Sequence, residues 1–188
     1  MSDAEPDELW DSLQQYVGQS LTGEGPVSAP DPVNMPMIRH WVDAFDDRNP
    51  VYEDADTATK TRFGGTVAPQ AMLQVWTFAR PIIEGIAERG GSPVEMSEDN
   101  PLVILDKAGY NATLATNSEL QFERPLRVGD ELTSDVVLES ISPRKKTGLG
   151  LGYFVTWASN YRDAAGELVG RQVFRVLKFN PMTMEGVS

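Results

Sequence analysis

Apolar side chains in the first quarter of the chain recur at the spacing of amphipathic helices. Residues 6–17 show this pattern, and so does the stretch that follows Asn34. Asn34 can cap the second helix, and Pro36 falls in its first turn, where proline is tolerated. This helix should end before Asn49, because Pro50 disfavours helical geometry at the preceding residue. Its apolar stripe consists of Ile38, Trp41, Val42 and Phe45.

Residues 68–91, "APQAMLQVWTFARPIIEGIAERGG", form the longest helical candidate. Small or apolar side chains occupy more than one face of this stretch, which predicts a helix buried on most sides. Pro81 should kink or end it, and a further turn can follow through Ile82, Ile83 and Ile86.

From about residue 113 the apolar period changes from about 3.6 to 2, which indicates β-strands. Four runs follow one another, separated by the turn sequences "RVGD", "SPRKKTG" and "RDAAGE". Consecutive strands with tight turns favour an antiparallel meander, and the class is α+β. We expect one domain over residues 1–188, with an N-terminal helix and loop (1–33), a helical part (34–112) and antiparallel strands (113–180). The sheet should wrap around the long helix. The alternating positions are Leu120 and Phe122; Leu132, Val136 and Leu138; Tyr153, Val155, Trp157 and Tyr161; and Val169, Val173, Leu177 and Phe179.

Composition narrows the function classes. A net charge of −12 repels phosphate backbones, so nucleic acid is a poor partner. The 188 residues include no cysteine, no apolar run long enough for a membrane span and no secretory leader, so we expect a cytoplasmic protein. The cations Arg144, Lys145 and Lys146 cluster in "PRKKTG". This stretch reads either as a solvated turn or as a local clamp for the phosphates of an anionic ligand.

Four motifs in the expected order carry a family resemblance: "AFDDRNPVYED" (44–54), "FGGTVAPQAML" (63–73), "ERPLRVGDEL" (123–132) and "NYRDAAGELVGRQVFRVLKF" (160–179). With them, residues 8–180 resemble the hot-dog fold of the MaoC-like enoyl-CoA hydratases and dehydratases. The resemblance is to their degenerate N-terminal-type halves. It implies a CoA thioester as substrate and no other cofactor.

The resemblance also shows which catalytic groups are altered. The family motif reads Asp-x-Asn-Pro-Leu/Ile-His; Asp47 and Asn49 match it, and Tyr52 stands where the histidine would be. A tyrosine, with an unperturbed pKa near 10, is a poor general base at neutral pH. The family also polarises the thioester carbonyl with a backbone N–H at the start of the central helix, usually at a glycine. Here that glycine is replaced around Ala68-Pro69-Gln70, and proline has no N–H.

Other candidate residues say less about the reaction. His40, the one histidine, is expected to be a surface or packing residue, and one histidine without cysteine leaves too few ligands for a metal. "GLGLG" (148–152) enters a strand rather than a helix, so its glycines should permit strand bending or close approach of a ligand, not dinucleotide binding. The expected substrate-binding residues are Arg144, Lys145 and Lys146 in the cationic turn, and Ala68, Gln70 and Met72 near the start of the long helix.

The resemblance is strongest to the larger, degenerate subunit of the heterotetrameric steroid side-chain enoyl-CoA hydratases. It implies a non-catalytic, pocket-forming subunit, a smaller catalytic hot-dog partner in an α2β2 assembly, and a bulky, steroid-like acyl-CoA substrate. In that group a C-terminal OB-fold domain often docks an aldolase; the chain ends just past its last expected strand, so we expect that domain to be absent. Two alternatives stay open: a self-sufficient hydratase or dehydratase that uses Asp47 with His40 or Tyr52, and an acyl-CoA-binding or scaffolding protein without turnover.

Overall fold

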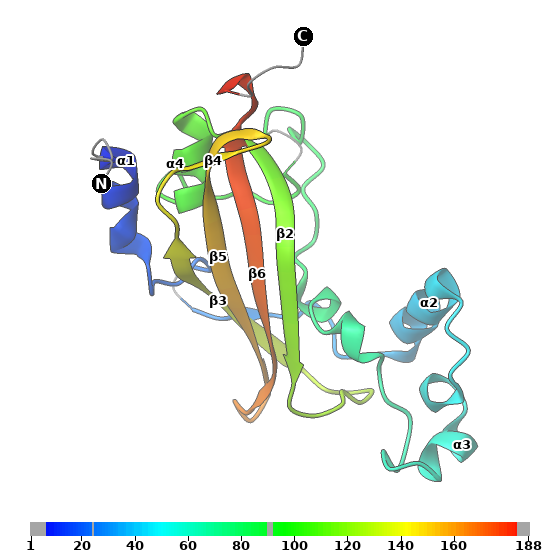
Figure 1. The fold of residues 1–188 in the computed structure, drawn as a ribbon. Coiled ribbons are helices and arrows are strands. Elements are labelled where there is room, and N and C mark those ends of the chain that lie inside the picture. The colour runs from blue at the N-terminus through cyan, green and yellow to red at the C-terminus, as the bar shows by residue number, and fades with distance from the viewer. Residues whose placement is uncertain (1–6, 24, 90–91, 184–188) are drawn as a thin grey trace.

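An antiparallel sheet dominates the computed structural model, which describes residues 7–23, 25–89 and 92–183 (Figure 1). The strands lie in the order β1-β3-β5-β6-β2, and β4 pairs with β5 outside this path. The α+β class is thereby confirmed. Of the four runs expected to form a consecutive meander, only β3, β5 and β6 do so, because the first run, β2, pairs with β6 and not with β3. The strands are β1 (Val27–Ser28), β2 (Ala112–Phe122), β3 (Leu132–Ile141), β4 (Lys145–Thr147), β5 (Gly150–Asp163) and β6 (Leu168–Asn180).

The register of the strands gives the sheet two distinct faces. Trp157 on β5 lies opposite Phe174 on β6, and their ring centroids are 5.3 Å apart. The face that carries these two rings is called the inner face here. Because side chains alternate along a strand, β6 also points Gln172, Val176 and Lys178 to the inner face. Of the alternating positions predicted for β6, Val173, Leu177 and Phe179 lie on the opposite face, and Val169 and Leu177 are buried.

The N-terminal part contains short helices, of which α2 begins at its predicted cap. They are α1 (Glu8–Leu13), η1 (Gln14–Tyr16), α2 (Met35–Phe45), η2 (Pro50–Tyr52) and α3 (Ala55–Thr59), η denoting a single 3-10 turn. The Asn34 side chain accepts a hydrogen bond from the Met37 N–H, as predicted for the start of α2. Asp46 ends this helix in the left-handed conformation, at φ 51°.

The long central helix predicted over residues 68–91 is not observed in the described part of that stretch. It contains only the 3-10 turns η3 (Gln70–Met72) and η4 (Val75–Thr77). At Phe78 the backbone becomes extended, and from there the chain runs irregularly to Asn100. Pro81 removes an N–H that a helix would need, and Gly85 adopts a positive φ of 69°. Residues 90–91 of the prediction lie outside the described residues.

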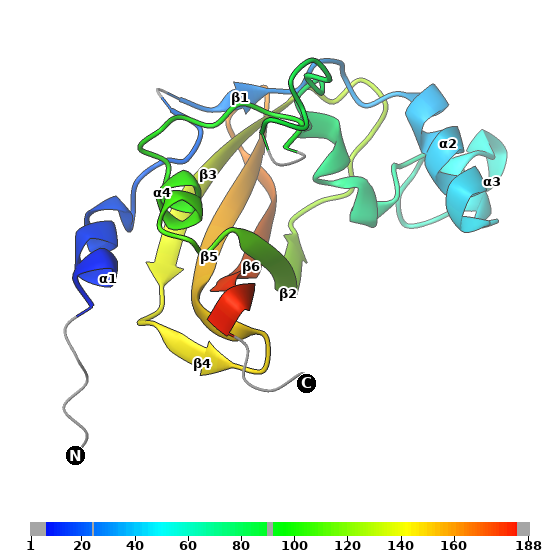
Figure 2. The ribbon, with the colours of Figure 1, turned by 90° about the horizontal axis from the view of Figure 1, so that it is seen from above.

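The inner face is covered at its two ends by different elements. At one end Met72, Leu73 and Trp76 pack with Tyr161 of β5 in one buried cluster that also includes α2 residues. At the other end, Leu105 of α4 (Pro101–Lys107) and Leu13 of α1 pack with inner-face residues of β3, β5 and β6. Figure 2 shows α4 on one side of the sheet, with α2 and α3 off to the side beyond the β2 edge. Between the two clusters no helix crosses the inner face in the described residues.

The last strands are tightly apposed at the glycine-rich stretch. A Cβ on Gly150 would approach the Asn180 carbonyl oxygen to 2.3 Å, and one on Gly152 would approach the Lys178 carbonyl oxygen to 2.4 Å. The glycines therefore allow β5 and β6 to approach closely, whereas the approach of a ligand to "GLGLG" stays a prediction. The chain then ends its described part in the 3-10 turn η5 (Pro181–Thr183). No helix among the described residues has the length and apolarity to cross a membrane.

Candidate functional site

The degenerate motif forms a tight, hydrogen-bonded turn after α2. The Asp47 N–H donates to the Val42 carbonyl at 2.9 Å, and Asp47 Oδ1 accepts from the Asn49 N–H at 3.1 Å. Asn49 Oδ1 in turn accepts from the Val51 N–H at 3.2 Å, which starts η2. The side chains of Asp47 and Asn49 therefore cap backbone groups, as polar residues in turns commonly do.

Tyr52 is half-buried behind this turn, between two hydrophobic clusters. Burial raises the pKa of its phenol above the usual value, the charge of Asp47 raises it further, and a hydrogen bond with Asn49 opposes both. Because the neutral form is favoured, Tyr52 is protonated at neutral pH and is a poor general base there.

A small pocket of about 270 Å³ brings several of the predicted site residues together: Asn49, Tyr52, Ala68 and Gln70 all line it. We call it the motif pocket. Met72, also predicted to bind substrate, instead lies fully buried in the cluster that holds Trp76. The N–H of Ala68 donates to the Leu126 carbonyl at 2.8 Å, and Pro69 has none. Within Ala68-Pro69-Gln70, the Ala68 N–H is therefore engaged within the protein and Pro69 offers no donor.

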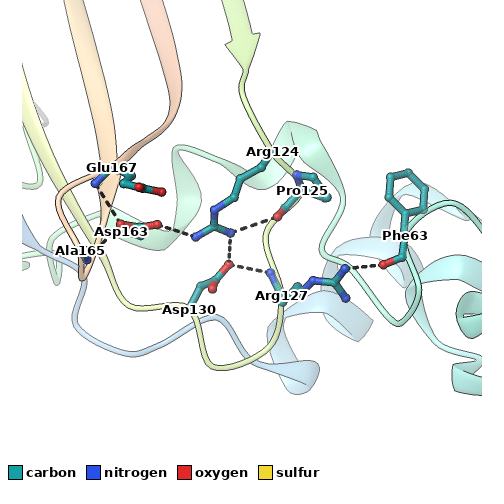
Figure 3. Close-up of polar contacts among 8 residues, drawn as sticks. All are labelled: Phe63, Arg124, Pro125, Arg127, Asp130, Asp163, Ala165 and Glu167. Carbon is teal, nitrogen blue, oxygen red and sulfur yellow. Dashed lines mark hydrogen bonds and ion pairs between the residues drawn. The ribbon is translucent and has the colours of Figure 1, made fainter.

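An arginine network holds the motif pocket against the sheet (Figure 3). Arg124 donates to Asp130 at 2.7 Å and to Asp163 at 3.0 Å, which joins the β2–β3 connection to the end of β5. Both carboxylates raise the pKa of Arg124, and Arg124 is the main cause of a lowered pKa at Asp163. The Arg127 guanidinium then donates to the Phe63 carbonyl beside the pocket.

A larger cavity of about 720 Å³ occupies the uncovered middle of the inner face. We call it the sheet cavity. Val136, Trp157 and Phe174 supply its apolar floor, and Phe78, Met96 and Leu102 of the irregular segment and α4 lie across from them. Its volume is within the range of small-molecule sites. The remaining lining residues are Leu21, Thr22, Gly23, Val27, Gln74, Thr77, Ala79, Val94, Glu95, Ser97, Asn100, Ser134, Ser159, Tyr161 and Gln172.

Polar side chains stand at the end of the sheet cavity nearest η4. The Tyr161 hydroxyl donates to Gln172 Oε1 at 3.3 Å, and Gln172 Nε2 donates to Ser118 Oγ at 3.0 Å. Burial raises the pKa of Tyr161. The sequence analysis did not single out Gln172, a polar residue among the apolar residues of β6. Both alternating sets of positions along this strand contain apolar side chains, so the pattern did not show which set faces the cavity.

The cationic turn lies at the opposite end of the sheet from the motif pocket. Lys145 pairs with Gly152 near the start of β5, whereas the arginine network reaches Asp163 at the end of that strand. The Arg144 N–H donates to Asp7 Oδ2 at 3.2 Å, and contact with Tyr110 is the main cause of a raised pKa at Arg144. The two sets of predicted binding residues are thus not brought together within this chain.

The one histidine lies outside both cavities. His40 is exposed on α2 and lines neither the motif pocket nor the sheet cavity, which agrees with the prediction of a surface residue.

Comparison with known proteins shows the family. The model for the FAS1-like dehydratase domain region matches residues 20–172, which is most of the chain. A probable enoyl-CoA hydratase alpha subunit from Thermomonospora curvata is 43% identical over 175 residues, covering 92% of this chain and 52% of that protein. The 3-oxo-4,17-pregnadiene-20-carboxyl-CoA hydratase alpha subunit from Mycobacterium tuberculosis is 37% identical over 173 residues, covering 90% of this chain and 52% of that protein. The chain thus spans about half the length of these curated relatives.

Solved structures agree with this result. The crystal structure of the ChsH1-ChsH2 complex from Mycobacterium tuberculosis contains a chain 34% identical to this one, with a TM-score of 0.77 over 93% of this chain and 92% of that one. The R-hydratase PhaJ1 from Pseudomonas aeruginosa is 21% identical, with a TM-score of 0.54 over 87% of this chain and 82% of that one. This likeness shows the shared fold. The chain therefore belongs to the FAS1-like dehydratase family and has the MaoC-like hot-dog fold.

Proposed function

We propose that this chain is the non-catalytic, pocket-forming subunit of a heteromeric enoyl-CoA hydratase that acts on a bulky, steroid-like 2-enoyl-CoA. The observation that carries the proposal is the sheet cavity. It lies where a hot-dog protein would place its central helix, and the chain there has only two 3-10 turns. An apolar space of about 720 Å³ suits a large ring system better than a short linear acyl chain.

The motif pocket supports a non-catalytic role. Hydration adds the oxygen of water to the β-carbon of the enoyl thioester and a proton to the α-carbon. This reaction needs a general base and donors for the enolate-like oxygen. Tyr52 is held protonated, and the Ala68 N–H is occupied by Leu126. We therefore assign both tasks to a smaller hot-dog partner that carries the Asp and His of the family motif.

Two adjoining surfaces suit such a partner. β2 is an edge strand of eleven residues whose side chains are mostly exposed, and edge strands readily pair with another sheet. The irregular segment adds exposed apolar side chains, with Ile83 at 66% exposure. A second hot-dog that extends the sheet through β2 would cover both. The proposed assembly is a heterodimer with one working site, doubled to a heterotetramer. The other exposed apolar residues of this segment are Phe78, Ile82, Val94 and Met96.

The proposal is tested by assaying hydration of enoyl-CoA thioesters with the isolated chain and with the chain co-purified with a hot-dog protein that carries the intact motif. We expect no turnover by the isolated chain, and turnover of a polycyclic enoyl-CoA by the complex. Light scattering of the complex checks the stoichiometry. Turnover by the pure chain that is lost in Asp47→Ala would contradict the non-catalytic role.

A further inference from the structure

A buried lysine lies at the end of the inner face remote from the motif pocket. Lys178 is only 5% exposed, although it is charged. Its Nζ donates to Asp106 Oδ1 of α4 and, at 2.9 Å, to Thr113 Oγ1 of β2. Burying a charge costs free energy that pairing recovers only in part. An apolar side chain could fill the same place among Val176 and Tyr153, so the packing does not explain this lysine.

Lys178 lines a second cavity that adjoins the sheet cavity. This second space, of about 570 Å³, is lined by Asp106, Thr113, Val176 and Lys178. It shares Met96, Leu102 and Trp157 with the sheet cavity, so the two lie side by side, and together they are called the groove here. From Gln172 to Lys178 along β6 the groove spans roughly 20 Å, at about 3.3 Å per residue.

The groove has a polar group at each end and an apolar middle. Tyr161 and Gln172 stand at the end beside η4, whereas Lys178 and Asp106 stand at the other. Trp157 and Phe174 line the stretch between them. A ligand that fills the groove would therefore be long and apolar, with a hydrogen-bonding group at its far end.

The charges at the Lys178 end of the groove indicate which ligand group fits there. An ammonium has three N–H donors, and the described residues supply acceptors for two of them. The charged residues that line this end are Glu88, Arg89, Asp106 and Lys178, two acids and two bases, so their formal charges cancel. Arg89 already donates to the backbone carbonyls of Ile82 and Ser92. An uncharged oxygen acceptor fits this end better than a carboxylate or a phosphate does.

We propose that Lys178 donates a hydrogen bond to a ketone oxygen at the end of the acyl group farthest from the thioester. Asp106 and Thr113 position its ammonium for this contact. The inference rests on the proposed function, because it assumes that the thioester end lies near η4 and the motif pocket. It makes Lys178 a residue that selects among bulky acyl groups by their distal oxygen.

The test compares the affinity of the full-length chain for three saturated CoA thioesters of one tetracyclic carboxylic acid. One carries a ketone on the ring farthest from the thioester, one a hydroxyl there and one no oxygen. Calorimetry gives each affinity, and saturated thioesters cannot be hydrated during the measurement. We expect the ketone to bind about tenfold to a hundredfold more tightly than the deoxy compound, as for a hydrogen bond from a charged donor.

Two variants assign the preference to Lys178. Lys178→Met should bind the ketone and the deoxy compound equally, while Lys107→Met, an exposed lysine of the same helix as Asp106, should keep the wild-type ratio. Equal binding of ketone and deoxy compounds by the wild-type chain would overturn the inference and leave the proposed function standing. A preference for the hydroxyl compound over the ketone would also overturn it. Binding of none of the three would contradict both proposals.

Discussion

The motif pocket and the sheet cavity differ in size and in the side chains that line them. The motif pocket keeps the backbone turns of the family motif, in which Asp47 and Asn49 cap N–H groups. However, Tyr52 is protonated, and the Ala68 N–H is bonded to the Leu126 carbonyl. The sheet cavity is more than twice as large, at about 720 against 270 Å³, and mixes an apolar floor with polar ends. Under the proposed function, this difference means that the motif pocket has a structural role and that the inner face binds the acyl group.

The largest expected effect comes from filling the sheet cavity. Val136→Trp places a bulky ring on the cavity floor and should weaken binding of a tetracyclic acyl-CoA by at least about thirtyfold, since it removes some 2 kcal/mol of apolar contact. The neighbouring Val137, on the opposite face of β3, is the matched control, and Val137→Trp should leave affinity nearly unchanged. Calorimetry with both variants checks this. Equal losses would show that the acyl group does not occupy the sheet cavity.

A smaller effect is expected at the partner surface. Ile83→Glu introduces a charge into the exposed apolar segment and should weaken association with the catalytic hot-dog partner by about tenfold, because the carboxylate would be buried without a partner. Leu149→Glu, an exposed apolar residue of the β4–β5 turn, is the control. Surface plasmon resonance measures both. Unchanged association of Ile83→Glu would exclude this segment from the interface.

The arginine network should contribute a pH-dependent part of the stability. Arg124→Gln should lower the melting temperature at pH 7 by a few degrees, because Arg124 pairs with two carboxylates at once. The pKa of Asp163 is lowered in the folded state, so its contribution is present above its unfolded pKa of about 3.9 and is lost as the pH falls through the folded value. The difference between wild type and variant should therefore shrink near pH 3. A difference that is the same at pH 3 and pH 7 would contradict this assignment.

Local sequence signals predicted much of the fold. The Asn34 cap, the break before Pro50 and the strands from residue 112 onward depend on neighbouring residues, and each is observed. The long helix was wrong although Pro81 was expected to kink or end it. Even before Pro81 the chain forms only the 3-10 turns η3 and η4, and after it a tertiary contact holds the Ile82 N–H to the Pro93 carbonyl.

The site was only partly accessible to sequence reasoning. Asn49, Tyr52, Ala68 and Gln70 were predicted from motifs, and the structure brings them together. Lys178 was not predicted, since its partner Asp106 lies 72 residues away and both registers of β6 read as apolar. Contacts over such separations follow from topology rather than from local pattern.

The cationic turn should have a modest effect on CoA binding. Replacing Arg144, Lys145 and Lys146 with serine should weaken binding of an acyl-CoA to the complex by about two- to fivefold at low salt, as expected for exposed charge contacts. The loss should shrink as salt rises, because screening already weakens such contacts. Affinity measured at two ionic strengths checks this, and no change at low salt would make the stretch an ordinary turn.

The smallest expected effect is the most informative about the motif pocket. Tyr52→His restores the family motif beside Asp47, yet we expect no hydration of enoyl-CoA by the isolated variant. The Ala68 N–H would still be bound to Leu126 and Pro69 would still offer no donor, so two of the three residues at the position of the family's glycine could not stabilise the enolate-like oxygen. Losing one such donor costs about a hundredfold to a thousandfold in other enzymes, which would hide any gain from the new base. Tyr52→Phe is the control for the loss of the phenol, and a sensitive absorbance assay with crotonyl-CoA and a polycyclic enoyl-CoA measures both. Turnover by Tyr52→His but not by Tyr52→Phe would show that the base alone had been missing. The absence of catalysis in the motif pocket would then depend on residue 52 alone.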